Sequence, residues 1–193
     1  IIDFSHPSVL NDLLQFAKEK KLPLVLATTG FSASQTEQIK AVANEIPLFF
    51  TFNMSLGINL LVALSKKAGE VLSGNFDIEI IEKHHNQKLD APSGTAIMLA
   101  EAINDTLDNK MIYEYDRHSK REKRRNNEIG IHSIRGGNIV GEHEVIFAGH
   151  DEVLTLSHKA TSKEVFAVGA LKAALFMNGQ SAGLYDMNNV ITL

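Results

Sequence analysis

The first third of the chain alternates short apolar runs with amphipathic stretches, and this order limits the folds that it can adopt. The apolar runs at residues 1–4, 23–27 and 47–52 have the length of strands. Residues 7–20 and 34–45, which separate them, have the length and spacing of helices. Strands that alternate with helices in this way predict a parallel, doubly wound α/β sheet with both faces covered.

The remaining residues follow a different pattern. After a long amphipathic helix that begins near residue 55, two alternating runs joined by Ala148-Gly149-His150-Asp151 predict an antiparallel hairpin. This half therefore favours an α+β arrangement, an open mixed or antiparallel sheet with helices on one face. The elements expected after this first helix are strands at 76–81, 130–135, 141–147, 152–158 and 183–187, and helices at 93–107 and 162–177.

Composition narrows the classes of partner. The net charge of −4 gives no general basic character for binding nucleic acid, and we expect the basic run at 120–125 to be a solvated loop rather than an anion patch. The longest apolar stretch, 56–64, is too short to span a bilayer, so no membrane partner is expected. The absence of cysteine excludes disulfides and a thiol nucleophile, and it is compatible with a cytoplasmic location.

Three predicted strands end in small or polar residues, at 3–6, 27–30 and 52–55. In doubly wound sheets, ligands bind beyond the carboxyl ends of the strands, so these segments are candidate binding loops. Ordinary turn chemistry is the alternative interpretation. The chain also begins without methionine, at what reads as the end of a buried strand, and we expect an upstream segment to be missing.

The segment 82–96, Glu-Lys-His-His-Asn-Gln-Lys-Leu-Asp-Ala-Pro-Ser-Gly-Thr-Ala, carries the strongest functional signal. Its Pro92 and Ser93 predict a helix start, where unpaired N–H groups and the helix dipole attract a carboxylate. Gly94 would let a ligand approach closely, and Lys88 supplies a positive charge and a proton. The segment therefore predicts an anion site with proton donors beside it.

The adjacent histidines of this segment should have different functions. His84 and His85 on an extended backbone would point to opposite sides, one toward a reacting centre and the other toward an anionic group. Packing or surface histidines beside an ordinary helix cap are the alternative. A metal site is disfavoured, because adjacent strand residues diverge and no third ligand has an obvious place.

With these residues in view, the chain closely resembles the dihydrodipicolinate reductase family over essentially its whole length. The segment 82–96 resembles that family's substrate-binding signature, which is very specific. The other matching segments, individually modest and in the family's order, are 2–5, 27–31, 53–59, 140–143, 157–160 and 183–187.

The resemblance implies an NADH- or NADPH-dependent reductase of the diaminopimelate and lysine pathway that acts on a small cyclic dicarboxylate. It implies a Rossmann-like dinucleotide-binding domain at 1–55 and an α+β domain at 56–162 that binds substrate and forms a homotetramer. Residues 163–193 would return to the dinucleotide-binding domain as a helix and a strand.

The resemblance also implies residue roles. By motif match, His84 is the proposed acid/base and Lys88 the proton donor. The positions expected to bind substrate carboxylates are His85, Gly94 and Thr95. The positions expected to line the nicotinamide end of the cofactor are Ala27, Thr28, Thr29, Thr51, Phe52, Asn53 and Met54, and Lys163 matches a place where some members carry an arginine.

The chain departs from the family in one respect. No G-x-x-G-x-x-G phosphate loop occurs in it, so it is expected to bind dinucleotide poorly, which weighs against turnover. Two alternatives therefore stay open. One is a non-catalytic dicarboxylate-binding or oligomerisation module, and the other is a different amino-acid-pathway dehydrogenase of Rossmann type.

Overall fold

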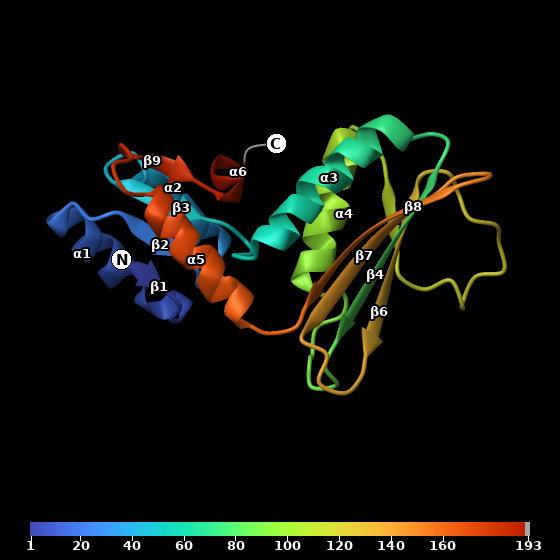
Figure 1. Cartoon of the computed structure of the whole chain (residues 1–193), viewed down its shortest axis with the longest axis horizontal. Helices are drawn as coiled ribbons and strands as arrows, with labels where there is room; N and C mark the ends of the chain where they lie inside the picture. The colour runs from blue at the N-terminus through green and yellow to red at the C-terminus, as the bar shows by residue number, and fades with distance from the viewer. Residues whose placement is uncertain (192–193) are drawn as a thin grey trace. The chain divides into compact units, whose positions relative to one another are not determined.

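The computed structural model describes residues 1–191 and divides them into two compact units. Unit 1 contains Ile1–Asn59 and the residues from Glu164 onward, and unit 2 contains Leu60–Lys163. Figure 1 shows the elements of both units along the chain. Within residues 1–191, no helix is both long and apolar enough to cross a bilayer.

Unit 1 is built on a four-stranded sheet in the order β1-β2-β3-β9, with every neighbouring pair parallel. Its parallel character is as predicted. All four strands end at the same edge of the sheet, so the loops after them are neighbours. The strands are β1 (Ile2–Asp3), β2 (Leu24–Leu26), β3 (Pro47–Phe50) and β9 (Gly183–Tyr185).

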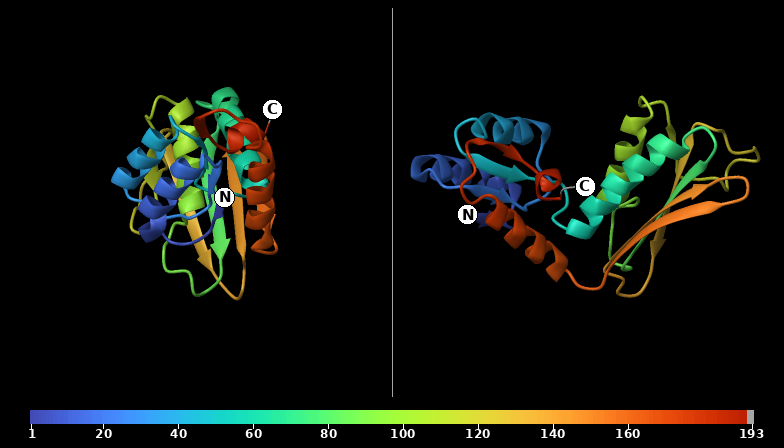
Figure 2. Two further views of the ribbon diagram at one scale, coloured as in Figure 1. Left: turned by 90° about the vertical axis from the view of Figure 1, so that its left-hand side faces the viewer. Right: turned by 45° about the horizontal axis from the view of Figure 1, so that its top comes forward.

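Apolar residues cover both faces of this sheet, as its continuous apolar strands require. Leu24 and Leu26 pack in one core cluster with apolar residues of α1 (Leu10–Lys20) and α2 (Ala33–Val42). Val25 points the other way and packs with Ala170 and Ala173 of α5 (Glu164–Phe176). Figure 2 shows α2 and α5 on opposite sides of the sheet.

Two features of unit 1 differ from the predictions. The first three residues of the helix predicted at 7–20 form a separate 3-10 turn, η1 (Pro7–Val9), before α1, and an unpredicted short helix, α6 (Met187–Val190), follows β9. The strand expected at 183–187 therefore ends at Tyr185, because the Asp186 side chain accepts a hydrogen bond from Asn188 N and caps α6 instead.

Unit 2 holds a five-stranded mixed sheet in the order β5-β6-β4-β7-β8. Its β5, β6 and β4 are parallel, whereas β4, β7 and β8 are antiparallel and include the predicted hairpin. Figure 1 shows α3 (Leu56–Leu72) and α4 (Gly94–Thr106) on one face of the sheet. The strands are β5 (Ile112–Glu114), β6 (Glu128–Arg135), β4 (Asp77–His84), β7 (Gly141–Ala148) and β8 (Val153–Ala160).

The strand predicted at 76–81 continues three residues further, to His84. Its buried positions alternate as Ile78, Ile80 and Glu82, so a carboxylate occupies the third position of an otherwise apolar face. The charged residues after Ile81 break the apolar pattern from which the strand was predicted. This extension places His84 inside the sheet and leaves His85 outside it.

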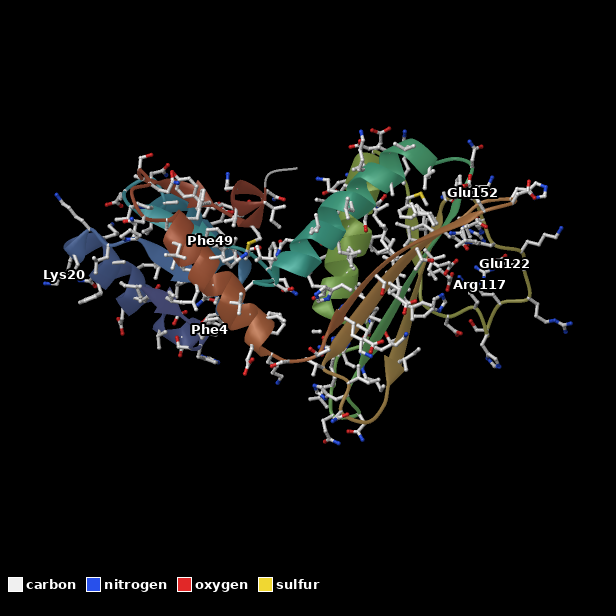
Figure 3. The ribbon with its side chains drawn as sticks, in the orientation of Figure 1. Phe4, Lys20, Phe49, Arg117, Glu122 and Glu152 are labelled. Atoms are coloured by element: carbon white, nitrogen blue, oxygen red, sulfur yellow. The ribbon has the colours of Figure 1, made fainter. Side chains whose placement is uncertain are left out.

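The basic run at 120–125 lies in the loop between β5 and β6, on which Figure 3 labels Arg117 and Glu122. The expectation of a solvated loop is wrong for Arg124, whose side chain is only 16% exposed. This guanidinium binds the carboxylates of Asp77 and Glu79 and the carbonyl oxygens of Ile78 and Glu128. Arg124 therefore fastens the loop to the starts of β4 and β6.

Candidate active site

The segment 82–96, which was predicted to form an anion site, runs from the end of β4 to the start of α4 in unit 2. The Ser93 side chain caps α4 by accepting a hydrogen bond from Ala96 N at 3.2 Å, which confirms the predicted helix start. The connecting loop turns tightly at its beginning, where Lys88 N donates to His85 O. The sequence segment 82–96 thus folds into strand, turn and helix N-terminus.

Glu82 lies at the centre of this region with none of its side chain exposed. Its Oε1 accepts hydrogen bonds from Ser93 N at 3.1 Å and from Arg135 Nη2 at 2.7 Å. Its Oε2 accepts from Arg135 Nη1 at 2.8 Å and lies 2.5 Å from His84 Nδ1. Burial alone would raise the pKa of this carboxyl, but the hydrogen bonds from Arg135, Ser133 and His84 outweigh it and lower the pKa to about 2.

The imidazole of His84 lies between Glu82 and Gly141. Its side chain is 12% exposed. A Cβ atom placed on Gly141 would lie 3.2 Å from His84 Nε2, so a side chain at this buried position would crowd the imidazole. The ring also meets His143 edge-on, with 5.2 Å between the ring centroids.

His143 is a second buried imidazole of the site. Its Nε2 lies 3.0 Å from Ser93 Oγ, so the α4 cap also contacts β7. Burial lowers the pKa of His143 to about 4, and the nearby His84, His158 and Lys88 add to that shift while Glu82 opposes it. His143 is therefore neutral at physiological pH, and His84 and Lys88 lie close enough to influence its pKa.

Lys88 forms an ion pair with Asp90, whose Oδ1 lies 2.8 Å from Nζ. A hydrogen bond from Lys88 is the main cause that lowers the pKa of Asp90. The Lys88 side chain is 22% exposed and that of Asp90 59%, so the pair lies at the surface of the site. Lys88 is thus partly accessible to a carboxylate from outside the chain.

The three predicted carboxylate-binding residues surround the same helix start. Gly94 is the first residue of α4, is exposed, and has open space where a side chain would lie. Thr95 follows it in the first turn, and His85 lies in the loop after β4, both half-buried. A carboxylate docked here would meet the positive end of the helix dipole.

Sequence reasoning missed three residues of this site. Glu82 could have been found, because it lies two positions before His84 and so shares its face of β4. Arg135, from β6, carried no local signal. His143, from β7, lies in the family-like segment 140–143, but nothing in that segment placed it beside His84. Within residues 1–191, no group of three or more His, Asp and Glu residues could hold a metal ion.

In unit 1, the predicted cofactor residues follow the carboxyl ends of β2 and β3. Thr28 is buried and donates a hydrogen bond from Oγ1 to Asp3 Oδ2 at 2.6 Å, which joins the ends of β1 and β2. Thr29 is exposed, and Gly30 has a positive φ of 82° that suits a sharp turn. Phe52 is 76% exposed.

The loop after β3 approaches α5 very closely. A Cβ atom on Gly169 would lie 1.7 Å from the carbonyl oxygen of Met54, so only glycine permits this contact. The same loop is braced from within, because Asn59 Nδ2 donates to the carbonyl oxygens of Asn53 and Ser55. Gly169 therefore helps to set the path of residues 51–54. Lys163, by contrast, is exposed and belongs to unit 2.

These strand ends fit the nicotinamide end of a dinucleotide. They supply backbone polar groups, hydroxyls and an exposed aromatic ring at the edge of a parallel sheet where such ligands bind. They do not supply a glycine-rich pyrophosphate loop, which the 193 residues lack.

Comparison with known proteins identifies two family regions that together cover nearly the whole chain. Residues 1–54 match the family region described as "Dihydrodipicolinate reductase, N-terminus", and residues 57–191 match "Dihydrodipicolinate reductase, C-terminus".

Comparison with individual relatives points to the same family. The chain is 55% identical over 191 residues to a 4-hydroxy-tetrahydrodipicolinate reductase of Caldanaerobacter subterraneus subsp. tengcongensis, covering 99% of this chain and 76% of the relative. It is 54% identical over 190 residues to the Clostridium tetani protein of the same name, covering 97% and 73%. A dipicolinate-bound dihydrodipicolinate reductase from Paenisporosarcina sp. TG-14 has the same fold, with a TM-score of 0.80 at 24% identity, covering 99% of this chain and 72% of that one.

Proposed function

The chain belongs to the dihydrodipicolinate reductase family, and on that premise we propose how its residues carry out the family's reaction. The reaction is the NAD(P)H-dependent reduction of 4-hydroxy-tetrahydrodipicolinate to tetrahydrodipicolinate, a step of diaminopimelate and lysine biosynthesis. Identity of 50–55% to enzymes of this name over nearly the whole chain carries the assignment. A cytoplasmic location is consistent with such an enzyme.

The substrate carries two carboxylates and must receive a proton during reduction. We assign one carboxylate to the N-terminus of α4, where Gly94 leaves open space and Thr95 lies in the first turn. His85 supports this anion from the preceding loop. Lys88 exchanges its internal partner Asp90 for the substrate, and its positive charge complements the dianion.

His84 is assigned the acid/base role. Its ring is held through Nδ1 against a buried carboxylate, which leaves Nε2 for proton transfer. A positioned acid that quenches the charge developing in the transition state typically contributes about 10²–10⁴-fold to the rate. Lys88 is assigned as the second proton donor.

A nicotinamide cofactor, when bound, supplies the hydride. The residues that would hold its nicotinamide end are Ala27, Thr28, Thr29, Thr51, Phe52, Asn53 and Met54, with a lesser contribution from Lys163. Either NADH or NADPH is compatible with these residues, because the two cofactors share the same nicotinamide and differ only in the 2′-phosphate of the adenosine ribose.

Calorimetric titration with pyridine-2,6-dicarboxylate in the presence of NADH tests the site. We expect saturable binding by the wild-type chain and its loss in Lys88→Ala. Lys110→Ala is the matched control, since Lys110 is an exposed lysine of the same unit that also pairs with an aspartate, Asp108. Equal binding by both variants, or no binding by a folded wild-type sample, would contradict the assignment.

The homotetramer is proposed from the free face of the unit 2 sheet. The face opposite α3 and α4 carries Ile134, which is 46% exposed, and the partly exposed Ile81 and Ile146. Apolar residues on an uncovered sheet face favour association. Ile134→Glu is expected to yield smaller species in sedimentation velocity, whereas Val71→Glu, which changes an exposed residue at the end of α3, is not. A stable wild-type monomer at micromolar concentration would refute the tetramer.

A further inference from the structure

We infer that Glu82 is a positioning residue: its carboxylate keeps a proton on Nδ1 of His84 and thereby presents Nε2 of that ring to the substrate. The inference rests on the proposed acid/base role of His84 and adds which nitrogen performs it. Glu82 itself does not touch the substrate, since its side chain is fully buried.

The hydrogen bonds of Glu82 determine which nitrogen carries the proton. Three of its contacts are N–H groups that can only donate, namely Ser93 N and both terminal nitrogens of Arg135. These donors hold the group as a carboxylate, in keeping with its lowered pKa. An ionised carboxylate only accepts hydrogen bonds, so the His84 nitrogen 2.5 Å from it must donate. Neutral His84 is therefore the Nδ1–H tautomer, with its lone pair on Nε2.

Nε2 is the nitrogen left for the substrate, because the buried carboxylate of Glu82 occupies Nδ1. Nδ1 faces the buried carboxylate, whereas Nε2 faces the Cα of Gly141, at a distance that a side chain on this residue would crowd. The contact with His143 approaches the ring edge-on and limits its tilt. Rotation of the ring would break the hydrogen bond to Glu82, so the direction of Nε2 is fixed.

The same carboxylate connects the acid to the anion site. Glu82 accepts from Ser93 N at the N-terminus of α4, where the substrate carboxylate is assigned. Its partner Arg135 also donates from Nη2 to the carbonyl oxygen of Asp90, in the loop that carries Lys88. Glu82 thus fixes the separation between the proton donor and the two anion-binding elements, which a reaction at a defined ring carbon requires.

The chain provides a matched control on the same strand. Glu79 lies on the opposite face of β4, and its Oε2 is 2.8 Å from His132 Nε2. It also binds an arginine, Arg124. Glu79 and Glu82 therefore share a carboxylate–imidazole–guanidinium arrangement, but only Glu82 lies in the site.

The experiment is ¹⁵N NMR of histidine-labelled protein above the pH at which the imidazoles lose their charge, comparing wild type, Glu82→Gln and Glu79→Gln. His84→Gln assigns the His84 signals. In the wild type, His84 is expected to be the Nδ1–H tautomer. In Glu82→Gln the amide offers one acceptor instead of two, so the Nε2–H tautomer should appear at His84. Glu79→Gln should change His132 and leave His84 as it is.

Turnover provides a second readout. In catalytically competent enzyme, Glu82→Gln is expected to lower kcat by about 10²-fold with little change in KM, because the proton sits on the wrong nitrogen of His84 while the anion site is unchanged. An Nε2–H tautomer at His84 in the wild type would overturn the inference even if the variant does not fold. A folded Glu82→Gln with the wild-type tautomer and kcat would also overturn it.

Dipicolinate added to the same wild-type samples separates this inference from the proposed function. If dipicolinate binds and the tautomer is wrong, the positioning role of Glu82 fails and the reductase site stands. If the tautomer is right and dipicolinate does not shift the His84 signals, the assigned substrate site fails while the geometry of the His84–Glu82 pair is upheld.

Discussion

Arg135 binds Glu82 with both of its terminal nitrogens, Nη1 2.8 Å from Oε2 and Nη2 2.7 Å from Oε1. The two residues come from the neighbouring strands β6 and β4 and are separated by 53 positions in the chain. This bidentate pair joins β6 to β4, and it holds in place the buried carboxylate that hydrogen-bonds to His84.

Acid should weaken the Glu82–Arg135 pair within a defined pH range. Folding lowers the Glu82 pKa from 4.5 to about 2, so the stability it contributes is present above pH 4.5 and is lost as the pH falls toward 2. The shift corresponds to about 3 kcal/mol. Urea unfolding, followed by circular dichroism, should show a difference in the free energy of unfolding between wild type and Glu82→Gln at pH 7, and this difference should shrink at pH 3. A difference that does not change with pH would contradict the prediction.

Ser93→Ala should cost more than loss of an ordinary helix cap. The hydroxyl caps α4 and also contacts His143 Nε2 inside the protein. We expect a loss of about 2–3 kcal/mol, of which about 1 kcal/mol is the cap and the rest the unpaired imidazole. Ser32→Ala is the control, because Ser32 caps α2 at an exposed site. Equal losses in urea unfolding would show that the His143 contact contributes nothing.

His84→Gln and Lys88→Ala should affect catalysis and spare the cofactor. In catalytically competent enzyme, each is expected to lower kcat by at least about 10²-fold and leave cofactor affinity nearly unchanged, because both residues lie in unit 2 beside the α4 N-terminus. Steady-state kinetics and NADH titration measure the two effects. His132→Gln serves as the control histidine, and near wild-type turnover of His84→Gln would refute the acid/base role.

Asp90→Asn should strengthen binding of the dicarboxylate. Asp90 neutralises Lys88 at 2.8 Å, and an incoming carboxylate must displace it. Removing this competitor is expected to tighten dipicolinate binding by about 1.5–5-fold, which corresponds to the roughly 0.2–1 kcal/mol that an exposed ion pair contributes. Stability should change by less than about 0.5 kcal/mol. Weaker binding in calorimetry would mean that Asp90 positions Lys88 instead of competing for it.

Gly169→Ala should damage the loop that we assign to the nicotinamide. The new methyl group would meet the Met54 carbonyl oxygen at 1.7 Å, so the loop or α5 must move. Although alanine favours helix by about 1 kcal/mol, overpacking against backbone costs about 1–3 kcal/mol, and a net destabilisation with weaker NADH binding is expected. Gly94→Ala is the control, since open space surrounds Gly94 and it lies in unit 2. Gly74→Ala would be unsuitable, because the positive φ of Gly74 disfavours alanine. Unchanged NADH affinity in Gly169→Ala would refute the role of residues 51–54.

Much of the fold followed from local patterns in the sequence. Apolar runs, helical spacing and the hairpin turn predicted the parallel sheet, the mixed sheet and nearly all of the longer elements, because burial of a strand or helix face imposes its period on nearby residues. The elements that were missed, β5 and α6, have three and four residues, too few to show a period. The segment 82–96 was recognisable as an anion site because a helix start and its charges are local features.

The tertiary structure alone decided what surrounds that segment. The register of β6 and β7 against β4 brings Arg135 and His143 to Glu82, and no neighbouring residue of either one signals this. Likewise, the close approach of α5 to the loop after β3 depends on Gly169, more than a hundred residues away from Met54. Local sequence determines which backbone elements form, whereas the partner of a buried charge is set by the packing of strands that are distant in the chain. The sequence therefore determined where the site lies, and strand pairing determined how its proton donor is held.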